Sequence, residues 1–213
     1  MKYAKSVGIG AAAALFVLVV VATMLGATTP GGRMAGMNMS GMNMGDMDMP
    51  GMEMGDMDMT SQLTGLEGEA FEVGFMSMMI AHHQSATEMA RWILESTENP
   101  EITQAAQTII DEQETEIEQM TAWLREWYGQ EPDAEMMGMM QDMMDGMMQT
   151  MTDAGDPERA FLEGMSDHHD GAIDMAQLAL FRSTHEQLRG LAEKIIRDQA
   201  GEINQFQTWL AER

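Results

Sequence analysis

A sixteen-residue pattern occurs twice in this chain, and its repetition constrains the fold more than any other feature of the sequence. Residues 75–90 read FMSMMIAHHQSATEMA, and residues 161–176 read FLEGMSDHHDGAIDMA. The two copies are 86 residues apart, and the same offset continues without a gap to a Trp-Leu pair near the end of each copy (123–124 and 209–210). A repeat of this length predicts two copies of one supersecondary unit that pack against each other.

Apolar residues in both copies fall at steps of three or four, the spacing of one face of an α-helix. Asn99 followed by Pro100 is a typical helix start, and Gly129 is a typical helix end. No stretch alternates as a strand does, so we predict an all-α fold. The predicted helices cover residues 63–98, 100–128, 133–152, 156–183 and 185 to the C-terminus.

Each repeat is predicted to form a helical hairpin. Two helices joined by a tight turn lie antiparallel, and one hairpin cannot bury its apolar face alone. Repeat one (66–128) and repeat two (156–213) are therefore expected to pair as a four-helix bundle within a domain that spans 63–213. A Met-rich insert at 133–152 is expected to add one more helix.

The N-terminal region differs in composition from the repeats. An uncharged run over 7–27 follows two lysines and is long enough to cross a bilayer, which predicts a transmembrane anchor over 1–30. A cleaved signal segment is the alternative, and both place the repeats outside the cytoplasm. Residues 31–62 are predicted to be a disordered linker, since pentads such as GMNMS and DMDMP hold Met at alternate places among helix-breaking residues. We interpret this spacing as metal capture, with a plain linker and oxidant scavenging as alternatives.

Composition limits the partners and the ligand chemistry. A net charge of −24 argues against binding to nucleic acid or anionic lipid and favours attraction of cations. The chain has 29 methionines and no cysteine. Soft metal ligation would therefore have to use Met thioethers and His imidazoles.

Four of the five histidines occupy one repeated position, as His82–His83 and His168–His169. Counting residues from the two predicted turns places His82 level with Glu116 and His168 level with Glu202. Adjacent histidines diverge by about 100° around a helix, so one of each pair is expected to point inward, and the sequence leaves open which one. We predict that at least one His of each pair binds a metal ion, with Glu116 and Glu202 as further candidate ligands. The alternative is a pair of hydrogen-bonded core histidines.

The doubled motif F-x-x-x-M-x-x-H-H-x-x-A-x-x-M-A, each copy followed by a helix that ends in Trp-Leu, resembles the bacterial domain-of-unknown-function family number 305. This family includes periplasmic copper-resistance proteins of the CopM type, and the resemblance covers about residues 66–213. It implies a ferritin-like four-helix bundle and copper binding outside the cytoplasm. The candidate ligands that it implies are His82, His83, Met79, Met89, His168, His169, Met165 and Met175.

The leading hypothesis for function is an extracytoplasmic copper-binding protein, in the periplasm or at the cell surface, anchored to the cytoplasmic membrane or secreted. It would sequester Cu(I) or transfer it to copper-handling partner proteins, with Cu(II) and Ag(I) as further candidate ions. We expect no enzymatic activity. The alternatives are a structural membrane-anchored helical module and a ferritin-like metal oxidase, but the Glu-x-x-His motif typical of such oxidases does not occur in this sequence.

Overall fold

The computed structural model describes residues 60–213, and within this range it contains six helices and no strand. The predicted all-α class is therefore confirmed for this part of the chain. The membrane segment predicted for 1–30 and most of the linker predicted for 31–62 lie outside the described residues. Among residues 60–213, none of the helices combines the length and apolarity that crossing a bilayer requires. The helices are α1 (Ser61–Thr64), α2 (Gly68–Ser96), α3 (Pro100–Tyr128), α4 (Ala134–Thr152), α5 (Pro157–Arg182) and α6 (Glu186–Ala211).

Helix ends follow local capping chemistry, and most lie where the sequence predicts them. The Asn99 side chain accepts hydrogen bonds from two backbone N–H groups in the first turn of α3. Gly129 ends α3 in the left-handed conformation, with a φ of 67°. The single helix predicted from residue 63 is wrong at its start, because residues 65–67 separate the short α1 from α2, and Glu67 is extended with a φ of −139° and a ψ of 157°. Since α1 begins at Ser61, the last two residues of the predicted linker are helical.

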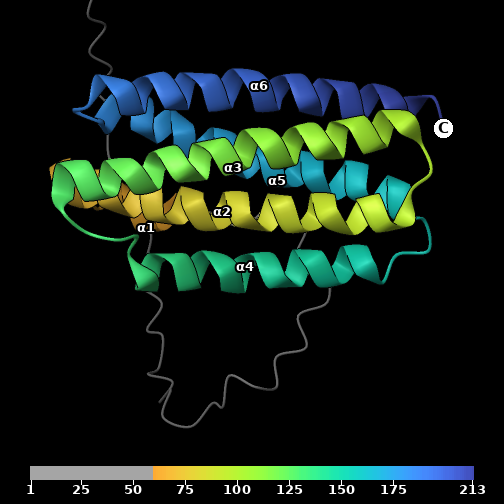
Figure 1. Cartoon of the computed structure of the whole chain (residues 1–213), viewed down its shortest axis with the longest axis horizontal. Helices are drawn as coiled ribbons and strands as arrows, with labels where there is room; N and C mark the ends of the chain where they lie inside the picture. Colours follow the sequence, from red (N-terminus) through yellow and green to blue (C-terminus); the bar gives the residue numbers. More distant parts are fainter. Residues whose placement is uncertain (1–59) are drawn as a thin grey trace, which may run out of the picture. The chain divides into compact units, whose positions relative to one another are not determined.

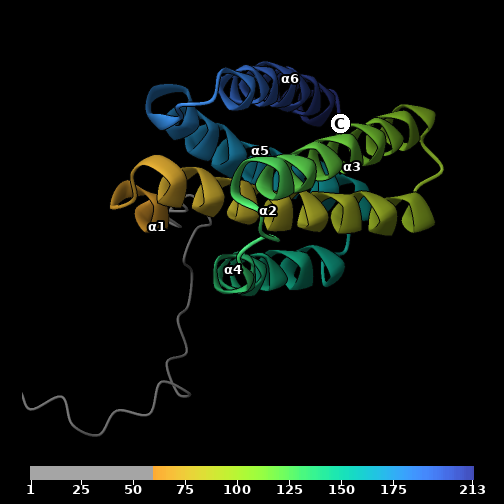
Figure 2. The same cartoon turned by 60° about the vertical axis from the view of Figure 1, so that its left-hand side comes forward.

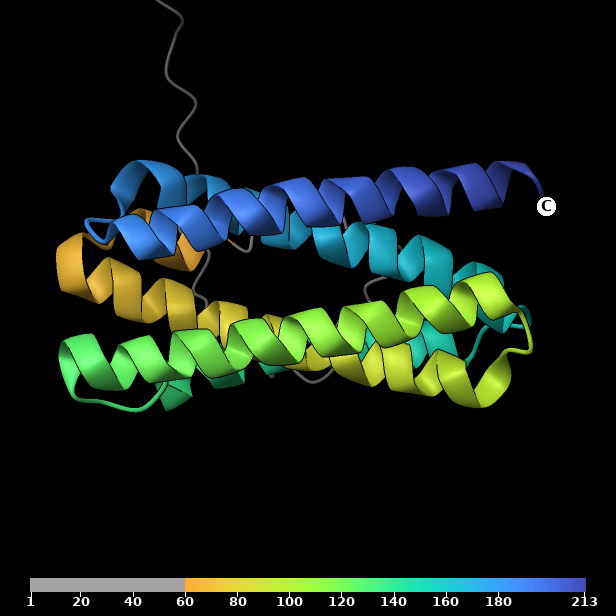
Figure 3. The same cartoon turned by 45° about the horizontal axis from the view of Figure 1, so that its top comes forward.

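Helices α2 and α5 form the centre of the bundle. Each packs against its hairpin partner, α2 against α3 and α5 against α6, and the two central helices pack against each other. Helix α4 covers α2 and α5 from one side (Figures 1 and 2). Figure 3 shows α3 and α6 together on the other side, in front of the central pair. The arrangement is a helical bundle made from two hairpins, with α4 as an additional helix.

The core consists of two apolar clusters at opposite ends of the long helices. The first cluster joins the start of α2 to the ends of α3 and α5, and includes Phe71 and Phe75. The second joins the end of α2 to the start of α3 and of α5, and includes Phe161 and Phe206. The motif histidines lie between the two clusters in sequence on both α2 and α5, so the repeat places a polar layer at mid-bundle.

Helix α4 contributes thioethers to both clusters. Its buried residues recur at helical spacing, with Met140 and Met144 in the first cluster and Met147 and Met151 in the second. At its far end the helix lies close to α5, because a Cβ atom at Gly164 would be only 2.7 Å from the Met151 sulfur. Gly164 therefore allows this close approach of α4 to α5.

Candidate metal centre

Four histidine side chains form a buried layer at the middle of α2 and α5. His82, His83, His168 and His169 are all 0 % exposed. The rings of His82 and His168 are in contact, with their centroids 3.7 Å apart. These two residues hold equivalent repeat positions, so the two hairpins meet at corresponding points of the repeat.

The other histidine of each pair faces the outer helix of its own hairpin. His83 Nε2 lies 2.7 Å from Glu116 Oε2 on α3, within hydrogen-bond geometry. His169 Nε2 lies 2.7 Å from Glu202 Oε2 on α6, an ion-pair distance without the alignment of a hydrogen bond.

The predicted partners of the two glutamates are therefore wrong by one residue. The sequence paired His82 with Glu116 and His168 with Glu202, whereas both acids contact the following histidine. The cause is the step of about 100° between adjacent helical residues. It turns His82 and His168 toward the α2–α5 contact and leaves the next position facing α3 or α6.

Burial keeps the central pair of imidazoles neutral. Loss of hydration lowers the pKa of His82 and of His168 well below the ordinary value, and the charges of the neighbouring histidines lower it further. A loosely aligned backbone contact between the two residues opposes this shift only in part. Both rings are therefore in the neutral form at pH 7, which is the form that binds metal ions.

Lys194 on α6 is a member of this site that sequence reasoning missed. Its Nζ donates to Glu116 Oε1 at 2.9 Å and lies 3.0 Å from Asp198 Oδ2. Burial would raise the pKa of Glu116, but the hydrogen bonds from His83 and Lys194 outweigh it and lower the pKa. A signal was available in the alignment of the repeats, because the position equivalent to Lys194 in repeat one is Thr108.

Most imidazole nitrogens in the histidine layer have no hydrogen-bond partner. Leaving a buried polar group unpaired costs about 1–3 kcal/mol, and native proteins do so rarely. Imidazoles with free nitrogens inside a buried layer have the donor chemistry of a metal site, so the residues present fit a metal ion. The nitrogens are both of His82, both of His168, Nδ1 of His83 and both of His169, whose Nε2 has only the Glu202 contact described above.

The four predicted methionine ligands are all 0 % exposed and are divided between the two core clusters. Met79 and Met175 belong to the first cluster, and Met89 and Met165 belong to the second. Each cluster thus combines one thioether from each repeat, on either side of the histidine layer. Within residues 60–213, His, Asp and Glu side chains form no group of three or more that could hold a metal ion by themselves.

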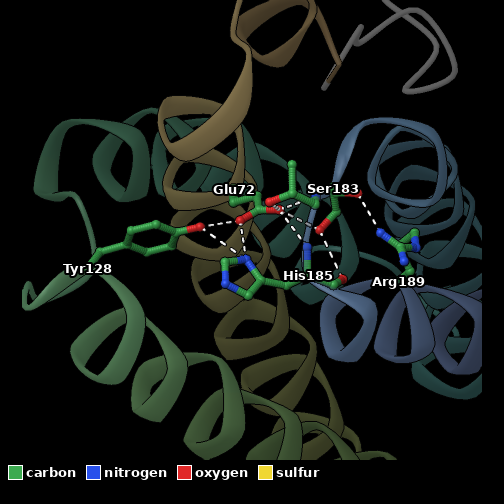
Figure 4. Close-up of polar contacts among 6 residues, drawn as sticks. Glu72, Tyr128, Ser183, His185 and Arg189 are labelled. Carbon is green, nitrogen blue, oxygen red and sulfur yellow. Dashed lines mark hydrogen bonds and ion pairs between the residues drawn. The ribbon is translucent and has the colours of Figure 1, made fainter.

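A second buried acid, Glu72, lies about 15 Å along α2 from the histidine layer. Its carboxylate accepts hydrogen bonds from the Tyr128 hydroxyl, from the Ser183 hydroxyl at 2.7 Å and from the backbone N–H of His185 at 3.1 Å (Figure 4). Burial opposes ionisation, but these donors lower the pKa of Glu72 to about 2. The His185 ring lies 2.6 Å from the same carboxylate and stacks on Trp127. The network ties α2 to the end of α3 and to the α5–α6 turn, and the sequence analysis did not identify Glu72.

Comparison with known proteins gives a consistent set of relatives. The family profile described as "Domain of unknown function (DUF305)" matches residues 20–124 and 72–210. The apo form of CopM is 31 % identical with a TM-score of 0.59, and the match covers 66 % of this chain and 96 % of that one. CopM in the Cu(I)-bound form is 29 % identical with a TM-score of 0.57, over 66 % and 96 % of the two chains.

A DUF305 protein from Streptomyces coelicolor, provisionally classed as secreted, has the same architecture. It is 27 % identical with a TM-score of 0.58, and the match covers 66 % of this chain and 92 % of that one. Further solved structures of CopM contain Cu(II) or Ag, with similar identity to this chain. None of the curated proteins matches the chain.

Proposed function

This chain belongs to the DUF305 family, and we propose that it is an extracytoplasmic copper-binding protein that sequesters Cu(I) or transfers it to a partner protein. Cu(II) and Ag(I) are further candidate ions. Similarity to CopM supports this proposal, because CopM has been solved with Cu(I), with Cu(II) and with Ag.

The observation that carries the proposal is the buried histidine layer. Four imidazoles that are 0 % exposed lie together, and most of their nitrogens have no hydrogen-bond partner. A layer selected only for packing would pair these nitrogens or replace the rings by apolar side chains, since unpaired buried polar groups destabilise a fold.

The donor set suits a soft ion. Imidazoles and thioethers without any thiolate favour Cu(I), and buried methionines lie on both sides of the histidines. Glu116 and Glu202, which the sequence analysis counted among the ligands, each contact a ring nitrogen of a histidine. In the proposal they orient His83 and His169 and leave Nδ1 of each ring for the metal ion.

The N-terminal region has two roles in the proposal. Residues 1–30 would anchor or export the protein, and the Met-rich segment over 31–62 would capture ions for the bundle. We also propose that the bundle is of the ferritin-like type. We propose binding without catalysis, so the Cu(I)-loaded protein should consume oxygen no faster than free Cu(I) under the same conditions.

Metal analysis after anaerobic loading tests the function. The full-length protein is loaded in parallel with Cu(I), Fe(II) and Zn(II), weakly bound ions are removed by a competing chelator, and the retained metal is measured. Cu(I) should be retained in preference to the other two ions. Deleting residues 34–59 should lower the number of Cu(I) ions while leaving the tightest site intact.

Two variants separate ligation from structure. Replacing His82, His83, His168 and His169 by Ala should remove the tightest Cu(I) site. The matched control is His185→Gln, which changes the one histidine outside the layer and should keep that site. If the quadruple variant is helical by circular dichroism and keeps the tightest site, the histidine layer is structural and the proposal fails.

A further inference from the structure

A groove of about 510 Å³ runs between α3 and α6. Its acidic lining includes Glu112 from α3 and Asp198 and Glu202 from α6, with Arg197 as a basic neighbour. Burial raises the pKa of Glu112, Lys194 opposes the shift, and the charges of Glu202 and Asp198 add to it. Negative charge is therefore concentrated at this groove, on the side of the bundle that α4 does not cover (Figure 3).

The floor of the groove follows the repeat. A smaller pocket shares Glu112, Asp198 and Glu202 with the groove, so the two spaces adjoin. Gln113 and Gln199 line this pocket, each is 3 % exposed, and neither side-chain carbonyl oxygen has a hydrogen-bond partner. The lining consists of four pairs at equivalent repeat positions, Ile109/Ile195, Glu112/Asp198, Gln113/Gln199 and Glu116/Glu202.

This oxygen-lined floor leads to the buried histidines. Glu116 and Glu202 line the pocket and are also the acids that contact His83 and His169 at 2.7 Å. Carboxylate and amide oxygens can replace the hydration shell of a cation before it reaches softer donors. Unpartnered, buried amide oxygens at the floor point to such a ligand.

Lys194 breaks the symmetry of the floor. Its ammonium group binds Glu116, the glutamate that contacts the histidine of repeat one, and also Asp198 on its own helix. Burial lowers the pKa of Lys194, but these two acids outweigh it and raise the pKa. The equivalent residue beside the repeat-two half is Thr108, which carries no charge. The Glu202 side chain is 19 % exposed and lines the outer groove, whereas the Glu116 side chain is 6 % exposed and does not.

We infer that the floor of the α3–α6 groove is the site where cations enter the bundle, and that Lys194 is a built-in cation that occupies its repeat-one half. Incoming ions therefore bind first at the repeat-two half, through Glu202 to His169, and reach His83 only after Lys194 is displaced from Glu116. This inference rests on the proposed function, because it assumes that the histidine layer accepts metal ions.

The test follows each imidazole separately. Full-length protein in detergent micelles, labelled with ¹⁵N at histidine, is titrated with silver nitrate below one equivalent, and the ring signals are recorded. Ag(I) has the soft-ligand preference of Cu(I) and does not change oxidation state during the titration. Residues 1–59 contain no histidine, so every labelled ring belongs to the bundle.

The wild-type protein should show the His169 signals shifting before those of His83. Lys194→Thr, which copies the residue of repeat one, should make the two histidines respond together and speed loading of His83 by about tenfold or more, the scale of electrostatic effects on association. Thr108→Lys should delay His169, and the combination of both changes should reverse the order. Arg197→Thr is the matched control, since it removes a groove cation that does not bind Glu116.

Simultaneous responses in the wild-type protein, or an unchanged order in Lys194→Thr, would overturn the inference and leave the proposed function intact. If no imidazole responds to Ag(I), the proposed function fails, and the inference fails with it. Should the combined variant not fold, the single Thr108→Lys variant still decides the question. It retains Lys194 and must delay the response of the His169 signals to Ag(I).

Discussion

The His83–Glu116 and His169–Glu202 pairs share one distance, 2.7 Å between the nearest nitrogen and oxygen, but only the first is aligned as a hydrogen bond, and the two pairs differ in their electrostatic surroundings. In repeat one, Lys194 binds the glutamate from the neighbouring hairpin. In repeat two, the glutamate borders an open acidic groove. Duplication of the hairpin thus reproduces the positions of the side chains, whereas a single unrepeated residue makes the two halves chemically unequal.

The largest effect is expected from His82→Ala combined with His168→Ala, because these residues are shared by both halves. Changing a residue that only orients a ligand typically lowers metal affinity tenfold to a hundredfold. Loss of two direct ligands should therefore weaken Ag(I) binding by about a hundredfold or more, measured by competition titration. Glu116→Gln and Glu202→Gln should each weaken Ag(I) binding by only about tenfold to a hundredfold. A folded double variant with unchanged affinity would remove the central pair from the site.

Acid should destabilise the apo protein through the same two histidines. Their native-state pKa values are depressed, so below about pH 6.5 the unfolded chain binds protons that the folded chain does not. Stability should therefore fall as pH decreases, by up to about 1.4 kcal/mol per pH unit for each residue. Urea denaturation between pH 7.5 and 5 measures this slope.

The pH dependence also checks whether His82 and His168 are equivalent. His82→Leu and His168→Leu should each remove about half of the slope, and the double variant should remove most of it. If the two single variants remove unequal shares of the slope, the electrostatic difference that Lys194 creates between the repeats extends to the central pair. Measurements should stay above pH 5, since Glu72 and Glu116 have lowered pKa values and their contributions are lost only at more acidic pH. Because the pKa of the central pair is low, metal binding by these rings should also persist below pH 6.

The two glutamates should differ in their contribution to stability without metal. Glu116→Gln weakens contacts with His83 and with Lys194, and hydrogen bonds to charged groups contribute about 1.5–3 kcal/mol. Lys194 is 40 % exposed, so water screens its part, and we expect a loss of about 1–2 kcal/mol. Glu202→Gln should cost below about 1 kcal/mol. In a double-mutant cycle, Lys194→Thr should cost less in the Glu116→Gln background than in the wild type. Equal effects of the two Gln variants would contradict the comparison.

The smallest effects concern two glycines of the second hairpin. Gly164→Ala brings a methyl group against Met151, whose flexible side chain must shift, and should cost about 1 kcal/mol. Gly190→Ala meets no atom within 4 Å in the exposed face of α6 and should stabilise by about 0.5–1 kcal/mol. Thermal unfolding of both variants measures the two changes in stability. A stabilising Gly164→Ala would mean that α4 does not pack closely at this position.

The helices could be predicted well because their signals are local. Asn99 with Pro100 starts α3, and Gly129 ends it, by capping chemistry that depends only on neighbouring residues. The start of α2 could not be predicted in the same way. The break between α1 and α2 lies at residues 65–67, where Glu67 is extended, and Gly68 then begins α2 with a positive φ.

The site was predictable in composition but not in its pairing. The repeat identified the four histidines and both glutamates as candidates, and the family resemblance added the methionines. Which histidine faces Glu116 depends on the rotation of α2 about its axis, and that rotation is set by packing between the hairpins rather than by spacing within one. Lys194 and Glu72 could not be assigned roles for the same reason, since their partners are on helices distant in sequence.

The contacts of Glu72 are expected to form late when the chain folds. Its hydrogen-bond partners Ser183 and His185 lie 111 and 113 residues further along the chain, whereas contacts within each hairpin join residues much closer in sequence. Closing so long a loop is entropically unfavourable until other contacts support it. The hairpins should therefore form first and the Glu72 network should close late. Interactions formed after the transition state slow unfolding without speeding folding. We therefore expect the buried carboxylate to slow unfolding and to lengthen the lifetime of the assembled bundle.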